Sequence, residues 1–131
     1  MDERFYRGLE EFNRERFFEA HEVLEDLWHE YREADRIFIQ GLIQIAAAFY
    51  HVQSENIKGA MSQFRKGREK LTHFLPEYRD VSVARLLEDV RENVEKIQLA
   101  TVLIPDTITY PKIHFTRMAN TLNPGPNFKE N

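Results

Sequence analysis

The sequence predicts an all-α fold of about five helices, arranged as antiparallel hairpins around a buried central helix and followed by an extended C-terminal arm. Apolar side chains recur at helical spacing through residues 1–100, and no strand-like alternation appears before Thr101. Four of the five prolines follow Thr101, and proline excludes a long helix there. We therefore expect an all-helical domain over residues 1–100 and an arm over residues 101–131.

The first two helices are predicted from their apolar stripes. The first stripe ends at Phe12, and Asp2 is a suitable N-cap for that helix. The second helix should begin near Asn13, which can cap it, and Phe12 would then pack on Phe17 as a hydrophobic staple. The stripe of the second helix consists of Phe17, Ala20, Leu24, Leu27, Trp28 and Tyr31.

The third helix is the buried central one, because residues 36–52 are apolar nearly all round. We expect its cap around Asp35 and its end at the polar turn 54–56. A fourth helix follows and stops at Pro76. Residues 83–97 carry another regular apolar stripe and form the fifth.

The composition excludes several classes of function. The net charge is −4 with mixed signs, which disfavours nucleic acid and anionic membranes as partners. Without cysteine, the chain has no disulfide, thiolate or cysteine-based metal chemistry. No signal peptide is visible and the longest apolar run is too short to span a bilayer comfortably, so we expect a cytoplasmic protein.

The arm carries enough apolar residues to need a surface to pack on. That surface belongs either to its own domain or to a second subunit, in which case the arm makes a homodimer. The apolar residues are Val102, Leu103, Ile104, Ile108, Tyr110, Ile113 and Phe115.

Polar residues interrupt the apolar helices where they are least expected. Gln40, Gln44 and His51 fall on one face of the central helix, within an arc of roughly 40° at about 100° per residue. His21 and Glu25 are neighbours one turn apart on the second helix. Buried polar groups are costly unless they are satisfied, so the two groups predict a shared polar cluster between these helices.

Each part of this cluster has a functional and a structural interpretation. His21 with Glu25 is either a ligand or general-base pair or a simple boundary pair. The polar face of the central helix is either a pocket lining or an internal network that fixes helix register. Glu22 adds a carboxylate that points nearer to solvent, and Trp28 is either part of the face or a core aromatic. The spacing predicts no metal ligand set, and Glu-x-x-His is missing.

Three segments together resemble a small all-helical prokaryotic family known as domain of unknown function number 309. They are FFEAHEVLEDLW, QGLIQIAAAFYH and ENIKGA, within roughly residues 5–75. The resemblance implies an all-α fold and no established activity or cofactor. The positions that match the polar signature of the family are His21, Glu22, Glu25, Trp28, Gln40, Gln44 and His51.

Three functions remain open on this basis. The first is a small protein with a polar binding pocket between its second and third helices, for an unidentified small molecule or protein. The second is a metal-dependent hydrolase that uses His21, Glu25 and His51. The third is a peptide-binding helical-hairpin module of tetratricopeptide type, because residues 12–27 and 52–67 align as a faint repeat with an offset of 40 residues.

Overall fold

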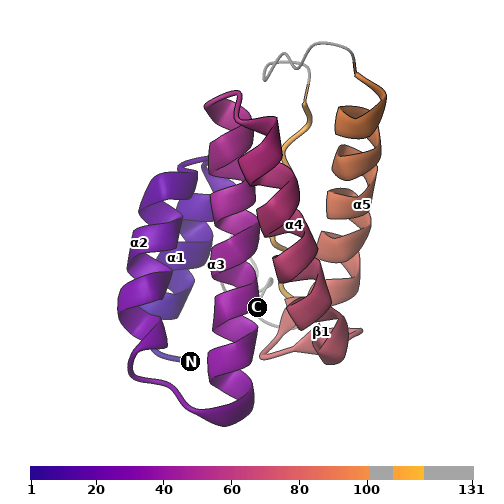
Figure 1. The fold of residues 1–131 in the computed structure, drawn as a ribbon. Coiled ribbons are helices and arrows are strands. Elements are labelled where there is room, and N and C mark those ends of the chain that lie inside the picture. The colour runs from indigo at the N-terminus through magenta and orange to yellow at the C-terminus, as the bar shows by residue number, and fades with distance from the viewer. Residues whose placement is uncertain (101–107, 117–131) are drawn as a thin grey trace, which may run out of the picture.

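The computed structural model describes residues 1–100 and 108–116, and it confirms the all-α fold (Figure 1). The helices run antiparallel to their neighbours in chain order, and a short hairpin precedes the last one. The elements are α1 (Glu3–Asn13), α2 (Phe17–Trp28), α3 (Glu33–Gln53), α4 (Ile57–Leu71), the 3₁₀ turn η1 (Thr72–Phe74), β1 (Glu77–Tyr78), β2 (Val81–Ser82) and α5 (Val83–Leu99).

The hairpins α1–α2 and α3–α4 are joined by turns of the same conformation, 40 residues apart. Glu15 and Glu55 both take left-handed φ values, 63° and 60°. Their backbone N–H groups donate to Phe12 and Val52 at 2.9 and 3.0 Å. The faint sequence repeat therefore corresponds to two copies of one helical-hairpin unit.

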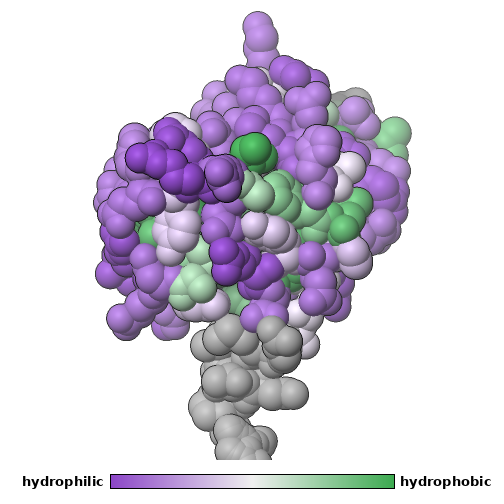
Figure 2. Space-filling model, turned by 90° about the horizontal axis from the view of Figure 1, so that it is seen from below, coloured by the Kyte–Doolittle hydropathy of each residue, from purple (hydrophilic) through white to green (hydrophobic). Residues whose placement is uncertain are grey.

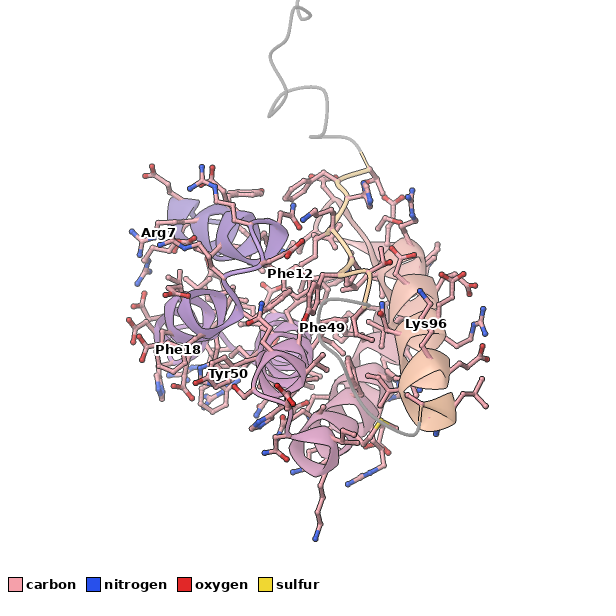
Figure 3. All side chains as sticks on the ribbon, turned by 90° about the horizontal axis from the view of Figure 1, so that it is seen from above. Arg7, Phe12, Phe18, Phe49, Tyr50 and Lys96 are labelled. Atoms are coloured by element: carbon pink, nitrogen blue, oxygen red, sulfur yellow. The ribbon has the colours of Figure 1, made fainter. Side chains whose placement is uncertain are left out.

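The core lies around α3, as predicted for the apolar central helix. Phe49 of α3 is fully buried and packs its ring against Phe12, Phe17 and Phe64, with centroids 5.0 to 6.1 Å apart. Figure 3 shows Phe12 and Phe49 pointing toward the centre of the bundle. Edge-to-face and stacked rings contribute beyond their buried area, so this cluster joins the two hairpins.

Glycines allow α3 and α4 to approach closely. A Cβ on Gly67 would lie 2.8 Å from Cδ1 of Ile45 and 3.1 Å from the carbonyl oxygen of Gly41. A Cβ on Gly41 would lie 2.8 Å from Cδ2 of Leu71. The close helix crossing therefore explains why the fourth helix tolerates a residue that disfavours helices.

The short hairpin β1–β2 was not expected from the sequence. Glu77 pairs with Ser82 and Tyr78 with Val81, and two left-handed residues form the turn. Two-residue strands are too short to show an alternating pattern. The prediction of no strand before Thr101 was therefore wrong at this one site.

Two predicted helix caps were also wrong. Asp2 does cap α1, and its carboxylate accepts from the backbone N–H of Arg4 at 2.7 Å. Asn13, however, is the last residue of α1, and Arg16 precedes α2. Asp35 lies inside α3, where its carboxylate accepts hydrogen bonds from Tyr78 and Arg79 of the hairpin region.

Residues 108–116 of the arm pack on the chain's own helices. Figure 3 shows this segment between α1 and α5, which lie on opposite sides of it. Ile108 and Ile113 are buried, and Phe115 forms an antiparallel bridge with Val81 of β2. Tyr110 packs its ring on Phe17 and Phe49. Val102, Leu103 and Ile104 lie outside the described residues, and the homodimer stays a prediction.

The end of the molecule near η1 exposes a band of hydrophobic and weakly polar residues among charged ones (Figure 2). Ile37 at the start of α3 and Leu75 after η1 are 48% and 47% exposed. Within residues 1–100 and 108–116, the helices are too short or too polar to cross a membrane.

Candidate functional site

The seven candidate residues lie on the two neighbouring helices α2 and α3. His21, Glu22, Glu25 and Trp28 belong to α2, and Gln40, Gln44 and His51 belong to α3. Glu22 and Glu25 are exposed, whereas the other five are half-buried. The candidate residues therefore lie at the boundary between the core and the surface.

Two contacts fix the register of α2 against α3. The guanidinium carbon of Arg36 lies 4.1 Å from the ring centroid of Trp28 at one end. The rings of Phe18 and Tyr50 lie 5.4 Å apart at the other end. Because the helices are antiparallel, this register places His21 at the level of residues 44–47 of α3.

Three of the candidate side chains carry a buried polar atom without a hydrogen-bond partner in the described protein. These atoms are Nδ1 of His21, Nε1 of Trp28 and Oε1 of Gln44. A buried polar group left without a partner costs about 1–3 kcal/mol. Nε1–H of Trp28 therefore has no acceptor among the described residues.

His51 makes its hydrogen bond away from α2. Its Nδ1 lies 3.3 Å from Nδ2 of Asn56, in the turn between α3 and α4. The same asparagine caps α4 by accepting from the backbone N–H of Gly59 at 2.9 Å. His51 therefore supports the cap of α4, and its convergence with His21 through a ligand or water stays a prediction.

An exposed aromatic pair lies between the two histidines. Phe18 is 45% exposed and Tyr50 is 40% exposed, and Figure 3 shows them side by side on the outer surface of α2 and α3. The ring of His21 is 6.5 Å from that of Phe18, and the ring of His51 is 6.1 Å from that of Tyr50. The site thus has a hydrophobic flank as well as a polar part.

Sequence reasoning missed this aromatic pair, although a signal was present. Phe18 lies beside Phe17 and off the apolar stripe of α2, so it cannot share the core with that stripe. Tyr50 lies beside the buried Phe49 in the same way. An aromatic residue off the stripe of an amphipathic helix is the kind of exposed apolar group that marks an interaction surface.

The structure offers no support for the metal-dependent hydrolase. Among residues 1–100 and 108–116, no three histidine, aspartate or glutamate side chains are grouped closely enough to hold a metal ion. The hydrogen bond of His51 to Asn56 also occupies one nitrogen of a proposed ligand.

Surface hollows occur elsewhere on the described part of the molecule. One of about 800 Å³ runs along α1 and is lined by Tyr6, Arg7 and Phe115 among others. Another of about 390 Å³ lies between α5 and residues 109–114 and is lined by Asn93. Neither contains a candidate residue of α2 or α3, so the candidate site is a surface strip between helices.

Comparison with known proteins gives one finding on the family and none on the activity. A search of the curated proteins finds no match to this chain. Residues 5–63 cover most of α1, all of α2 and α3, and the start of α4, and they include all seven candidate residues. Over residues 5–63, this small helical protein matches the family described as Domain of unknown function (DUF309), which confirms the resemblance read from the sequence.

Proposed function

We propose that the protein binds a small polar molecule on the outer face of α2 and α3, centred where His21 lies opposite Gln44. The observation that carries this proposal is the set of three buried polar atoms without protein partners, on His21, Trp28 and Gln44. A network that only fixed helix register would pair these atoms with one another or with the backbone. Because these atoms are buried, a molecule bound on this face would supply the missing partners once the three side chains turn outward.

The chemistry of the three atoms limits the ligand. Oε1 of Gln44 needs a donor, and Nε1–H of Trp28 needs an acceptor. Nδ1 of His21 serves either role, depending on its tautomer. The ligand therefore carries both donors and acceptors, as the edge of a nucleobase or the head of an amino acid does.

The surroundings suggest the rest of the ligand. Phe18 and Tyr50 provide exposed rings on which a flat apolar part can stack. Glu22 and Glu25 place two carboxylates at the exposed rim, and these disfavour an anion near His21. We therefore propose a neutral or cationic molecule with a flat ring and a polar edge.

The test is a thermal-shift screen of the full chain with purine and pyrimidine bases, their nucleosides and aromatic amino acids. A compound at 100 times its Kd stabilises the folded protein by about 2.7 kcal/mol, a shift that melting curves resolve. Binding should also change the fluorescence of Trp28, the single tryptophan of the chain. The shift should disappear in His21→Leu and in Gln44→Leu.

The control is His73→Leu, which changes an exposed histidine of η1 outside the site. This variant should keep the full ligand shift. The proposal fails if no compound of the panel stabilises the protein. It also fails if the shift is the same in Gln44→Leu as in the unaltered chain.

A further inference from the structure

Residues 108–116 lie in a groove between α1 and α5 in the manner of a bound peptide. Asn13 of α1 holds the backbone of Ile113 on both sides: its Oδ1 accepts from the N–H at 2.6 Å, and its Nδ2 donates to the carbonyl at 3.1 Å. From the opposite wall, Nδ2 of Asn93 in α5 donates to the carbonyl of Thr109 at 3.0 Å. Both asparagines form hydrogen bonds with backbone groups, so these bonds can hold an extended chain regardless of its side chains.

The end of the segment is held by strand addition. The backbone N–H of Ser82 donates to the carbonyl of His114 at 2.8 Å, and that of Thr116 donates to the carbonyl of Asp80 at 2.7 Å. These bonds flank the antiparallel bridge between Val81 and Phe115. Addition of an extended peptide to the edge of a small sheet is a common mode of peptide recognition.

Side chains of the segment fill three kinds of subsite. Tyr110 packs its ring against Phe17 and Phe49, with centroids 5.4 and 5.7 Å away. The second kind is apolar and takes Ile113, which is 3% exposed. The third is acidic, because Nζ of Lys112 donates to the carbonyl of Asn13 at 2.6 Å and lies 3.4 Å from a carboxylate oxygen of Glu15.

One polar atom of the groove receives no hydrogen bond from residues 108–116. Asn93 is 3% exposed, and its Oδ1 has no hydrogen-bond partner in the described protein although its Nδ2 makes two bonds. This asparagine also lines the hollow of about 390 Å³ beside the segment. A buried acceptor without a donor, next to open space, leaves room for one further hydrogen bond beside the backbone of a bound peptide.

We propose that this groove is a peptide-binding site and that residues 108–116 are its intramolecular occupant. The ligand is an extended peptide with an aromatic residue, a proline, a basic residue and a β-branched apolar residue in succession, as in Tyr110–Ile113. This site is separate from the strip on α2 and α3, and the proposal does not rest on the function assigned there. A tethered occupant reaches millimolar effective concentration, so it must be weakened before a peptide binds from outside.

The test uses the full chain with its own segment weakened by Ile113→Glu. This change places a charge in an apolar subsite and should release the segment. The probe is a fluorescein-labelled synthetic peptide with the sequence of residues 108–116, ITYPKIHFT, measured by fluorescence anisotropy. We expect saturable binding at least tenfold tighter than to the unaltered chain.

Two matched controls define the site. A peptide of scrambled sequence should not bind. Adding Asn13→Ala to the Ile113→Glu chain should weaken binding of the labelled peptide at least tenfold, whereas adding Gln53→Ala, its counterpart 40 residues on, should leave it unchanged. The proposal is overturned if the helical Ile113→Glu chain does not bind the peptide, or if Asn13→Ala has no effect on binding.

A second experiment tests the proposal if circular dichroism shows that Ile113→Glu has lost its helices. A protease site is inserted after residue 104 of the otherwise unaltered chain, and the folded protein is cut there. The labelled peptide should then exchange with the cut segment, and the labelled complex should elute with the protein. Absence of exchange would overturn the proposal.

Discussion

Replacing Asn13 by alanine should remove the anchor of the C-terminal segment and destabilise the protein. The side chain of Asn13 makes two hydrogen bonds with the backbone of Ile113, and no other hydrogen bond to that backbone is seen in the described protein. Because Ile113 is 3% exposed, its N–H and carbonyl would be left buried without partners. A buried unpaired group costs about 1–3 kcal/mol, so the two together should cost about 2–6 kcal/mol.

Gln53→Ala provides the matched control. Gln53 has the same place at the end of α3 as Asn13 has at the end of α1, but its side chain is exposed and donates only to the carbonyl of Glu15 at 3.0 Å. Loss of one exposed hydrogen bond should cost about 0.5–1 kcal/mol. The two variants therefore separate the anchoring of the segment from a general effect at the turn.

The assay is urea unfolding of the full chain, followed by circular dichroism. With an m-value of about 2 kcal/mol/M, Asn13→Ala should lower the midpoint by about 1–3 M, and Gln53→Ala by much less. Equal midpoints for the two variants would refute the anchoring role of Asn13.

Two further outcomes follow from the packing and charges of α3. The hydrogen bond from Arg79, with a further one from Tyr78, lowers the pKa of Asp35 below its ordinary value of 3.8. The stability that the Asp35 carboxylate contributes is therefore complete above pH 3.8 and is lost as the pH falls through the lowered pKa. The stability of Asp35→Asn should fall less steeply with acid than that of the unaltered chain, and an equally steep fall would contradict this. Gly67→Ala should lower the unfolding free energy, measured in urea, by about 1–2 kcal/mol despite the better helix propensity of alanine. The reason is that its Cβ would lie 2.8 Å from Ile45 and 3.1 Å from the carbonyl oxygen of Gly41. A more stable variant would show that α3 and α4 can move apart.

The helices could be predicted from the sequence because their signals are local and periodic. The turn 54–56 and the cap at Asp2 were read correctly, since both depend on residues adjacent in the chain. The caps assigned to Asn13 and Asp35 were wrong for the opposite reason. Each side chain is used by a distant segment, Ile113 for the first and the β1–β2 region for the second.

The candidate site could be predicted as a set of residues but not as an arrangement. A helical wheel places Gln40, Gln44 and His51 on one face, and the structure has them on α3 next to α2. The wheel does not show that His51, at the end of α3, makes its hydrogen bond with Asn56 at the start of α4 and not with α2. Nor does it show whether a polar atom is paired, because pairing depends on the neighbouring helix and its register.

The groove for residues 108–116 could not be predicted in this form. The apolar residues of the arm indicated that it packs on a surface, but not whether that surface belongs to its own domain or to a second subunit. The recognition of the backbone by Asn13 and Asn93 depends on helices whose sequence separation from the segment is up to 100 residues. No local pattern marks an asparagine for such a role.

The unfolding free energy of Gln44→Leu, measured without added ligand, tests the central claim most directly. If Oε1 of Gln44 is unpaired because it serves a ligand, an apolar side chain of similar size should leave stability unchanged or raise it. His21→Leu should behave in the same way, with its orphaned Nδ1 removed. A loss of about 1–3 kcal/mol in both variants would show instead that these side chains belong to a structural network, and it would contradict the account.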